Sequence, residues 1–215
     1  ITTCFGQGFH YHVDLNNIRL DRVKVKVILP KQSENSIVFS FPKQVPGTYA
    51  NYDFGRYIQS FRAIAKDGQM LPVKQKNINQ YQIDQVGQLD RIEYEVNDTW
   101  DSPEIKGEYI FEPAGTNIQK DTTFAFNVHG FLGYVAGQEK NPVQLTIERP
   151  KHLFGATSLV NTGKGNRDVF TSANYQSLLD APILYSPADT ASIQFPETNI
   201  LISVYSPNQK ITAEE

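Results

Sequence analysis

Cysteine, methionine and tryptophan are almost absent from this chain of 215 residues, which contains one of each. The single cysteine, Cys4, excludes an internal disulfide but does not decide the compartment, because many exported proteins lack disulfides. Ile1 rather than methionine begins the sequence, which indicates a processed chain whose signal peptide is out of view. A lipid-modified Cys4 is disfavoured, because no apolar run precedes it. We expect a periplasmic or extracellular protein.

Long apolar runs and clusters of positive charge are also missing. No apolar stretch approaches the roughly 20 residues that a membrane-spanning helix needs. The formal net charge is -3, and lysine and arginine are scattered. The densest basic stretch, residues 22–27, alternates with valine and is typical of the solvent-facing side of a strand. A membrane span and a nucleic-acid partner are therefore both disfavoured.

What the sequence does contain is short segments with apolar residues at every second position. Such alternation predicts half-buried strands over residues 9–15, 20–29, 37–41, 60–66, 70–74, 81–84, 91–96, 143–148, 157–160 and 200–205. Turn signals separate them, among them Asp67-Gly68. We predict an all-β fold, a large antiparallel β-sandwich or saddle-like sheet domain, with an antiparallel meander as the simplest assembly. One short helix is expected near 172–179, capped by Ser172. The β domain would cover 1–206, and 207–215 would be a linker.

The most distinctive stretch is residues 45–58, which follow a buried strand. Pro46 and Gly47 predict a tight turn, because proline fixes φ and glycine accepts a positive φ. Four aromatic residues follow at 49, 52, 54 and 57, with spacings that fit neither a strand nor a long helix. We interpret the stretch as an aromatic corner that closes one end of the fold; a ligand-facing role is the alternative.

No catalytic set is evident in the sequence. His10 and His12 share one side of a strand, but no third metal ligand is indicated, and surface histidines are the default interpretation. The zincin motif His-Glu-x-x-His is absent, and Gly163-Lys164-Gly165 is not a nucleotide loop. Cys4 has no evident base partner. The glycosylation-type triplet Asn97-Asp98-Thr99 is close to chance in a chain with many asparagines.

Three stretches carry a resemblance to a known family. They are Val45-Pro46-Gly47-Thr48-Tyr49 with Asp53-Phe54-Gly55-Arg56-Tyr57-Ile58, Phe126-Asn127 with Phe131-Leu132, and Tyr175-Gln176-Ser177-Leu178-Leu179-Asp180-Ala181-Pro182-Ile183. In order and spacing they resemble motifs in the N-terminal domain of glycyl-aminopeptidase-type zinc metallopeptidases, over about residues 9–205. The first and third motifs are moderately specific, and the second is loose.

The resemblance implies that this chain is the first, non-catalytic domain of a zinc metallo-aminopeptidase. A thermolysin-like zinc domain and often a PDZ domain would follow, so the zinc and the general base would lie outside this chain. Related β domains rim the substrate cleft, and Asn127 and Tyr49 are the candidate rim residues here, with a packing role as the alternative. Residues 184–186, Leu-Tyr-Ser, depart from the family's Glu-x-Gly, which leaves open whether the parent is active.

Three hypotheses for the function are therefore considered. The first follows from the resemblance, and its partners are the parent's own catalytic domain and a peptide substrate. The second is a free-standing carbohydrate- or protein-binding sandwich whose exposed aromatics Tyr49, Tyr52, Tyr57 and Trp100 stack on a ligand. The third is a purely structural adhesion domain. The first hypothesis predicts exposed apolar residues where the partner domain would pack.

Overall fold

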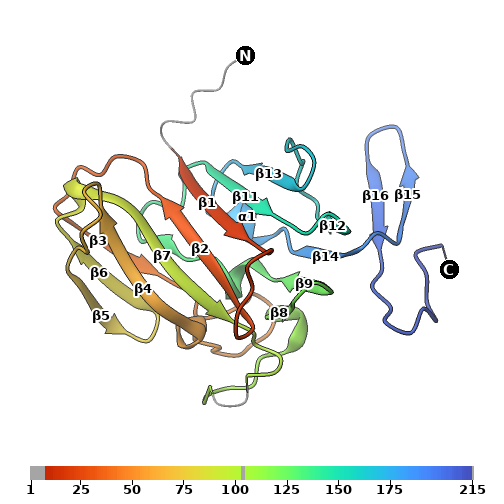
Figure 1. The fold of residues 1–215 in the computed structure, drawn as a ribbon, viewed down its shortest axis with the longest axis horizontal. Helices are drawn as coiled ribbons and strands as arrows, with labels where there is room; N and C mark the ends of the chain where they lie inside the picture. Colours follow the sequence, from red (N-terminus) through yellow and green to blue (C-terminus); the bar gives the residue numbers. More distant parts are fainter. Residues whose placement is uncertain (1–7, 103–104, 215) are drawn as a thin grey trace.

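The computed structural model describes residues 8–102 and 105–214, so Cys4 and the inferences about it lie outside the described residues. Strands dominate this part of the chain, and the predicted all-β fold with one short helix is confirmed. Figure 1 shows the largest sheet running across the body, with a separate hairpin near the C-terminus. None of the described helices is long and apolar enough to cross a membrane.

The largest sheet has six strands. They are β1 Phe9–Asp14, β2 Arg22–Ile28, β4 Ile58–Ala65, β7 Leu89–Asn97, β11 Val143–Glu148 and β13 Arg167–Ser172. Their order is β13-β11-β1-β2-β7-β4, and all neighbours are antiparallel except β1 and β11, which are parallel. The expected simple meander is therefore wrong. A parallel pair needs a long connection, here the whole segment between β1 and β11, which local patterns do not reveal.

Two four-stranded sheets complete the body. One contains β3 Ser36–Ser40, β5 Val73–Asn77, β6 Gln80–Asp84 and β10 Tyr134–Val135, in the order β10-β3-β6-β5. The other contains β8 Thr116–Gln119, β9 Thr123–Phe126, β12 Leu153–Ala156 and β14 Ile183–Pro187, in the order β12-β14-β9-β8. Side chains from all three sheets, among them Tyr11, Phe39 and Phe124, form one continuous core. Burial of this shared core stabilises the sandwich.

Helical structure is limited to short elements. The only α-helix of the described residues is α1 Tyr175–Leu179, and single 3₁₀ turns are η1 Phe54–Tyr57, η2 Val86–Gln88, η3 Glu112–Ala114 and η4 Val128–Gly130. The predicted helix near 172–179 is confirmed, but its predicted cap is wrong. Ser172 stays in β13 opposite Val143. The helix therefore begins later, and the Asn174 side chain accepts the Ser177 N–H at 2.8 Å.

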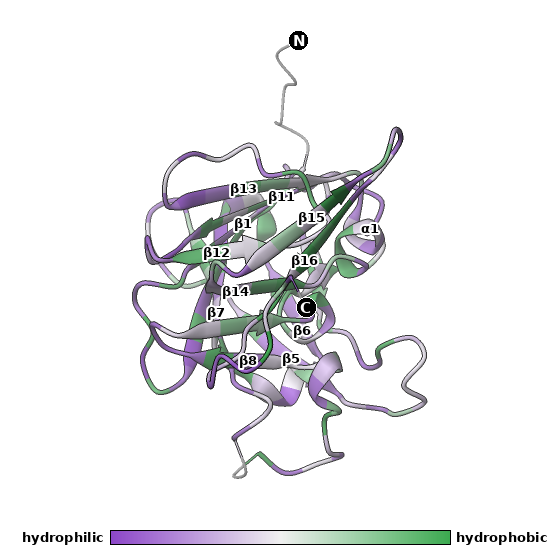
Figure 2. Ribbon diagram, turned by 90° about the vertical axis from the view of Figure 1, so that its right-hand side faces the viewer, coloured by the Kyte–Doolittle hydropathy of each residue, from purple (hydrophilic) through white to green (hydrophobic). Residues whose placement is uncertain are grey.

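The last two strands stand apart from the three sheets. β15 Thr190–Gln194 and β16 Asn199–Ser203 pair with each other in a two-stranded sheet, and most of their side chains are exposed. Ile193, Ile200 and Leu201 are 49%, 46% and 41% exposed. Figure 2 shows the hairpin in front of the body, with apolar colouring along β16. A two-stranded hairpin is marginally stable alone, so this element needs a further contact.

Several strand positions differ from those expected. The strand predicted at 157–160 is absent; the chain pairs earlier, in β12, where Leu153 is buried, whereas Val160 is 75% exposed. The strand expected at 70–74 begins three residues later, as β5. The strand expected at 200–205 is 199–203. The sequence analysis missed β8, β13, β14 and β15, whose short segments carry weaker alternation.

Candidate substrate-cleft rim

Residues 45–58 form the expected aromatic corner. Gly47 has a φ of 86°, and the Thr48 N–H donates to the Val45 carbonyl, as in a type II turn with Pro46 at its second position. The chain then enters the single helical turn η1. Three aromatics of the stretch are buried in a small second core with Ile110 and Ala114; they are Tyr52, Phe54 and Tyr57. The corner therefore packs three of its four aromatic side chains inward, around a small core of its own.

The motif at residues 53–56 fastens this corner to the turn between β5 and β6. Asn79 in that turn donates to Asp53 Oδ1 at 2.7 Å and accepts the Gly55 N–H at 3.0 Å. A Cβ on Gly55 would collide with the Ile78 carbonyl and lie 2.7 Å from the Asn79 Cα, so only glycine fits here. The residues that carried the resemblance are thus used to hold the fold together.

Three tyrosines hold the segment 131–133, which contains Phe131 and Leu132 of the second motif and the glycine after them. Tyr11 Oη donates to the Gly133 carbonyl at 2.7 Å, and Tyr175 Oη donates to the Leu132 carbonyl at 2.5 Å. Tyr94 Oη accepts the Gly133 N–H at 3.2 Å. Burial raises the pKa of Tyr11 and Tyr175 well above the ordinary value, which keeps both hydroxyls protonated as donors. The second and third motifs are therefore in direct contact.

Asn127 caps η4 with its side chain. Its Oδ1 accepts the His129 N–H at 3.1 Å and lies 2.9 Å from His129 Nδ1, while its Nδ2 donates to the Pro113 carbonyl at 3.1 Å. Burial lowers the pKa of His129, and the nearby Asp180 opposes that effect. Both the oxygen and the nitrogen of the Asn127 amide therefore have protein partners, so the side chain helps to hold the fold together. Its role at a cleft rim stays a prediction.

Tyr49 and Asn127 line different hollows. Tyr49 is fully exposed, with a φ of 56°, and borders a hollow of about 570 Å³ that also contacts His129. Asn127 borders a groove of about 820 Å³ together with Trp100 and the exposed Ile200 of β16. Since η4 supplies His129 to one hollow and is capped by Asn127 in the other, it lies at the border of both. The two predicted rim residues are not brought into one site.

The wall that β16 gives to the groove was missed by the sequence analysis. Ile200 and Leu201 were expected in an ordinary last strand, yet both line the groove and stay exposed. A signal was present: residues 200–202 are three consecutive apolar residues without alternation. Such a run is typical of a strand whose two faces are both buried. In β16, however, the described residues leave side chains on both faces of the strand partly exposed.

Comparison with protein families gives a match over most of the chain. A profile of the Peptidase M61 N-terminal domain matches residues 10–187. The chain belongs to the Peptidase M61 N-terminal domain family. The matched residues include the motifs quoted above and end before the hairpin β15–β16. A search of curated proteins gives no match.

Comparison with solved structures shows that one of them shares the fold of this chain. An aminopeptidase N family protein from Idiomarina loihiensis superposes with a TM-score of 0.76 at 20% identity, over 92% of this chain and 32% of that one. An M1 zinc metallopeptidase from Deinococcus radiodurans gives a TM-score of 0.46 at 13% identity, over 97% of this chain and 50% of that one. The M61 N-terminal domain chain thus spans about a third to a half of the length of these proteins.

No zinc site is evident among the described residues of this M61 N-terminal domain. Within residues 8–102 and 105–214, no three His, Cys, Asp or Glu side chains lie close enough together to hold a metal. His12 faces Lys26 across the sheet, and burial and this charge both lower the pKa of His12. We therefore assign no zinc-dependent step to the described residues. Asn97 of the glycosylation-type triplet is 3% exposed and donates to the Tyr57 carbonyl.

Proposed function

We propose that this M61 N-terminal domain is the non-catalytic β domain of a zinc aminopeptidase, which packs on the catalytic domain and shapes its substrate cleft. Its partners are then the parent's own catalytic domain and a peptide substrate. We further propose that the catalytic domain is thermolysin-like and holds the zinc, that a PDZ domain accompanies it, and that the parent is exported to the periplasm or beyond.

The observation that carries this proposal is the unpaired apolar surface around β16. Ile200 and Leu201 are exposed and form one wall of the 820 Å³ groove, and Ala125 and Ile183 of the neighbouring sheet contribute to the other side. Exposed apolar surface of this kind marks a protein contact. The family is described as an N-terminal domain, and its profile ends just before this hairpin. A domain that follows in the chain is therefore the occupant that we propose for the groove.

Tyr49 and Asn127 are the residues that we propose for the cleft rim. Tyr49 supports this role by its full exposure beside a hollow, since an unpaired aromatic ring is available to contact a substrate. Asn127 borders the groove on which the catalytic domain would pack. The two residues would then act on separate parts of the cleft, one on each side of η4.

The aromatic-platform hypothesis has less support. It required four exposed rings, but Tyr52 and Tyr57 are only 3% and 4% exposed and belong to the small second core. That part of the expectation is wrong, because the corner turns both rings inward. Trp100 is 46% exposed, and its indole N–H already donates to the Glu112 carbonyl. A stacking surface made of Tyr49 and Trp100 alone would be divided between two separate hollows.

The test of the proposed function compares this chain with its parent reading frame. We expect the gene to continue past Glu215 into a helix with a His-Glu-x-x-His motif. The 215-residue chain should bind no stoichiometric zinc and hydrolyse no aminoacyl substrate, whereas the parent should do both. Peptide hydrolysis by this chain alone, or a stop codon directly after Glu215, would overturn the proposal.

A further inference from the structure

The hairpin β15–β16 has two unlike sides. Directly opposite residues of an antiparallel pair point to the same side. Ile193 lies opposite Ile200 and Ala191 lies opposite Ile202, so one side is apolar throughout, and we name these four residues the apolar face. The other side is polar apart from Leu201; its polar members are Thr190, Ser192, Gln194, Asn199 and Ser203. Antiparallel sheets with this pattern pack their apolar side against a core.

The apolar face is nevertheless exposed to solvent. Ile193 is 49% exposed, Ile202 is 38% exposed, and Phe195, two positions after Ile193, is 54% exposed. Three of the four hairpin residues that border the groove of about 820 Å³ belong to the polar side, and Ile200 is the fourth. Ile193, Phe195 and Ile202 therefore lie outside the contact that would fill the groove.

The body of the domain does not hold the hairpin in place. Among the described residues, no hydrogen bond or ion pair joins residues 190–203 to residues 8–187, and the side chains of 190–203 belong to neither hydrophobic core. The bond from the Val204 N–H to the Asp189 carbonyl, at 3.0 Å, closes the base of the hairpin on itself. A two-stranded hairpin is marginally stable alone, so the contacts within this chain do not account for its order.

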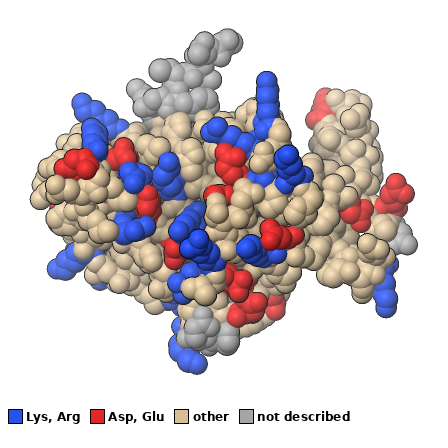
Figure 3. Space-filling view, viewed as in Figure 1, with Lys and Arg blue, Asp and Glu red and all other residues tan. Residues whose placement is uncertain are grey.

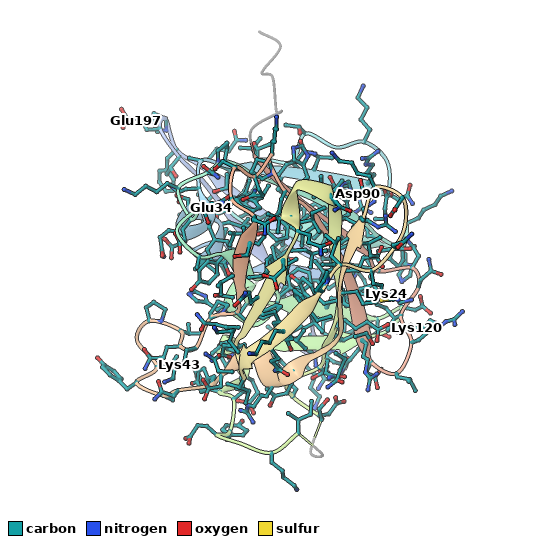
Figure 4. The ribbon with its side chains drawn as sticks, turned by 90° about the vertical axis from the view of Figure 1, so that its left-hand side faces the viewer. Lys24, Glu34, Lys43, Asp90, Lys120 and Glu197 are labelled. Carbon is teal, nitrogen blue, oxygen red and sulfur yellow. The ribbon has the colours of Figure 1, made fainter. Side chains whose placement is uncertain are left out.

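Charge is nearly absent from the hairpin. Residues 190–203 contain no lysine or arginine and a single acidic residue, Glu197. Figure 3 shows a mostly uncharged hairpin beside a body on which both signs are interspersed, and in Figure 4 Glu197 projects at the edge of the molecule. Strands that stay uncovered in solution are usually protected by charges such as lysine. The composition therefore favours an uncharged protein surface as the partner and disfavours an anionic lipid or a nucleic acid.

The size of the exposed patch decides between a second copy of the chain and a domain on the same polypeptide. Four side chains that are each about half exposed supply roughly 400 Å² of contact, whereas a stable interface between separate proteins buries about 800 Å² on each partner. A smaller patch is sufficient for a tethered partner, because the tether keeps that partner at a high effective concentration. A second copy is therefore disfavoured.

The hairpin segment also belongs to a fold that occurs in a longer protein. The superposition with a TM-score of 0.76 covers 92% of this chain, which is more than residues 1–187 can supply, so it includes part of residues 188–215. This chain covers only 32% of that protein. The family itself is described as an N-terminal domain. These observations favour a domain of the same polypeptide as the occupant of the apolar face.

We propose that the apolar face of β15–β16 packs on an uncharged, apolar surface of the parent's catalytic domain. This contact rests on the proposed function, because its occupant is the catalytic domain, and it adds Ile193, Phe195 and Ile202, which do not border the groove. The hairpin would then be covered on both sides and would fix the position of one domain relative to the other.

The test compares thiol labelling by N-ethylmaleimide in this chain and in the full-length parent, with Cys4→Ser removing the native thiol of this segment from both. Ile193→Cys reports on the apolar face, Leu201→Cys on the groove, and Lys74→Cys on the exposed β5 is the control. In the chain alone all three should react readily. In the parent, packing should slow the labelling of Ile193→Cys at least about tenfold and leave that of Lys74→Cys unchanged.

The labelling of Leu201→Cys separates this contact from the proposed function. Fast labelling of Ile193→Cys in the parent would overturn the contact, and slow labelling of Leu201→Cys in the same protein would then leave the proposed packing in the groove standing. Slow labelling of Ile193→Cys in the chain alone, with a dimer seen by sedimentation, would assign the apolar face to a second copy and would also overturn the contact.

A charge placed on the apolar face gives a second readout. Ile193→Asp should leave the melting temperature of the chain alone unchanged, because that side chain is already exposed. In the parent it should speed amide exchange of residues 190–203 at least about tenfold, because burying a carboxylate opposes docking. Gln194→Asp adds the same charge on the polar side and is the matched control. Equal exchange in the two variants would overturn the proposed contact.

Discussion

Asp98 is a buried carboxylate directly after β7. Its oxygens accept the backbone N–H groups of Trp100, Asp101 and Ile118, which joins the start of the following loop to β8. These donors favour the charged form, but burial outweighs them and raises the pKa of Asp98 to about 6. The folded state therefore holds a proton on Asp98 more tightly than the unfolded chain does.

The pH dependence of stability follows from this difference. The contribution of Asp98 is fully present below the unfolded pKa of about 4 and is lost as pH rises through about 6. Asp98→Asn removes this titration and leaves the Ile118 N–H without an acceptor, which should cost about 1–3 kcal/mol. Urea unfolding at pH 4, 5, 6 and 7 should show the gap between wild type and variant shrinking as pH rises. A gap that stays constant or widens would contradict this explanation.

At the scale of elements, a buried ion pair ties three strands together. Arg149, directly after β11, donates to Asp168 of β13 at 2.8 Å and to the Leu153 carbonyl of β12 at 2.6 Å. Asp168 also accepts the Tyr185 hydroxyl of β14 at 3.0 Å. The side chains of Arg149 and Asp168 are 14% and 3% exposed. The network therefore links the largest sheet to one of the smaller sheets.

Breaking this network should destabilise the whole fold. Arg149→Met leaves the Asp168 carboxylate buried without its cation, and we expect a loss of about 3–5 kcal/mol in the free energy of unfolding. Arg167→Met is the matched control: its contact with Glu148 is exposed on both sides, and its loss should cost at most about 1 kcal/mol. Equal losses in the two variants, measured by urea unfolding, would show that the buried network adds nothing specific.

The sequence predicted the strands with strong alternation and missed those without it. In β1 and β2 each second residue is apolar and buried, so periodicity alone locates them. The parallel pairing of β1 with β11 depends on residues more than 120 positions apart in the chain, and no local pattern encodes it. Ser172 and Asn174 are both good caps; pairing of Ser172 in β13 decides between them, and that is a tertiary effect.

The candidate site was predictable only in part. Pro46 and Gly47 were enough to predict the turn. The aromatic residues that follow it could not be assigned to the core or to the surface, because an aromatic ring can occupy either. Tyr49 lies on the turn and is exposed, whereas Tyr52 and Tyr57 pack against Ile110, which is far away in the sequence.

At the scale of the whole molecule, the hairpin β15–β16 is the least self-sufficient element. The six-stranded sheet and its two partners share one core, but the hairpin has only its own two strands and keeps Ile200 and Leu201 exposed. We propose that a catalytic domain of the parent protein would supply the missing contacts. The hairpin would then be fully ordered only when that domain is present.

The most direct test is amide hydrogen exchange in residues 190–203, compared between this chain and the full-length parent. In the chain alone we expect these amides to exchange quickly, because a two-stranded hairpin with exposed side chains opens readily. In the parent they should be protected by at least about tenfold, while protection of β1 and β2 should be the same in both proteins. Equal exchange of the hairpin in the two proteins would contradict the claim that this domain docks on a catalytic neighbour through β16.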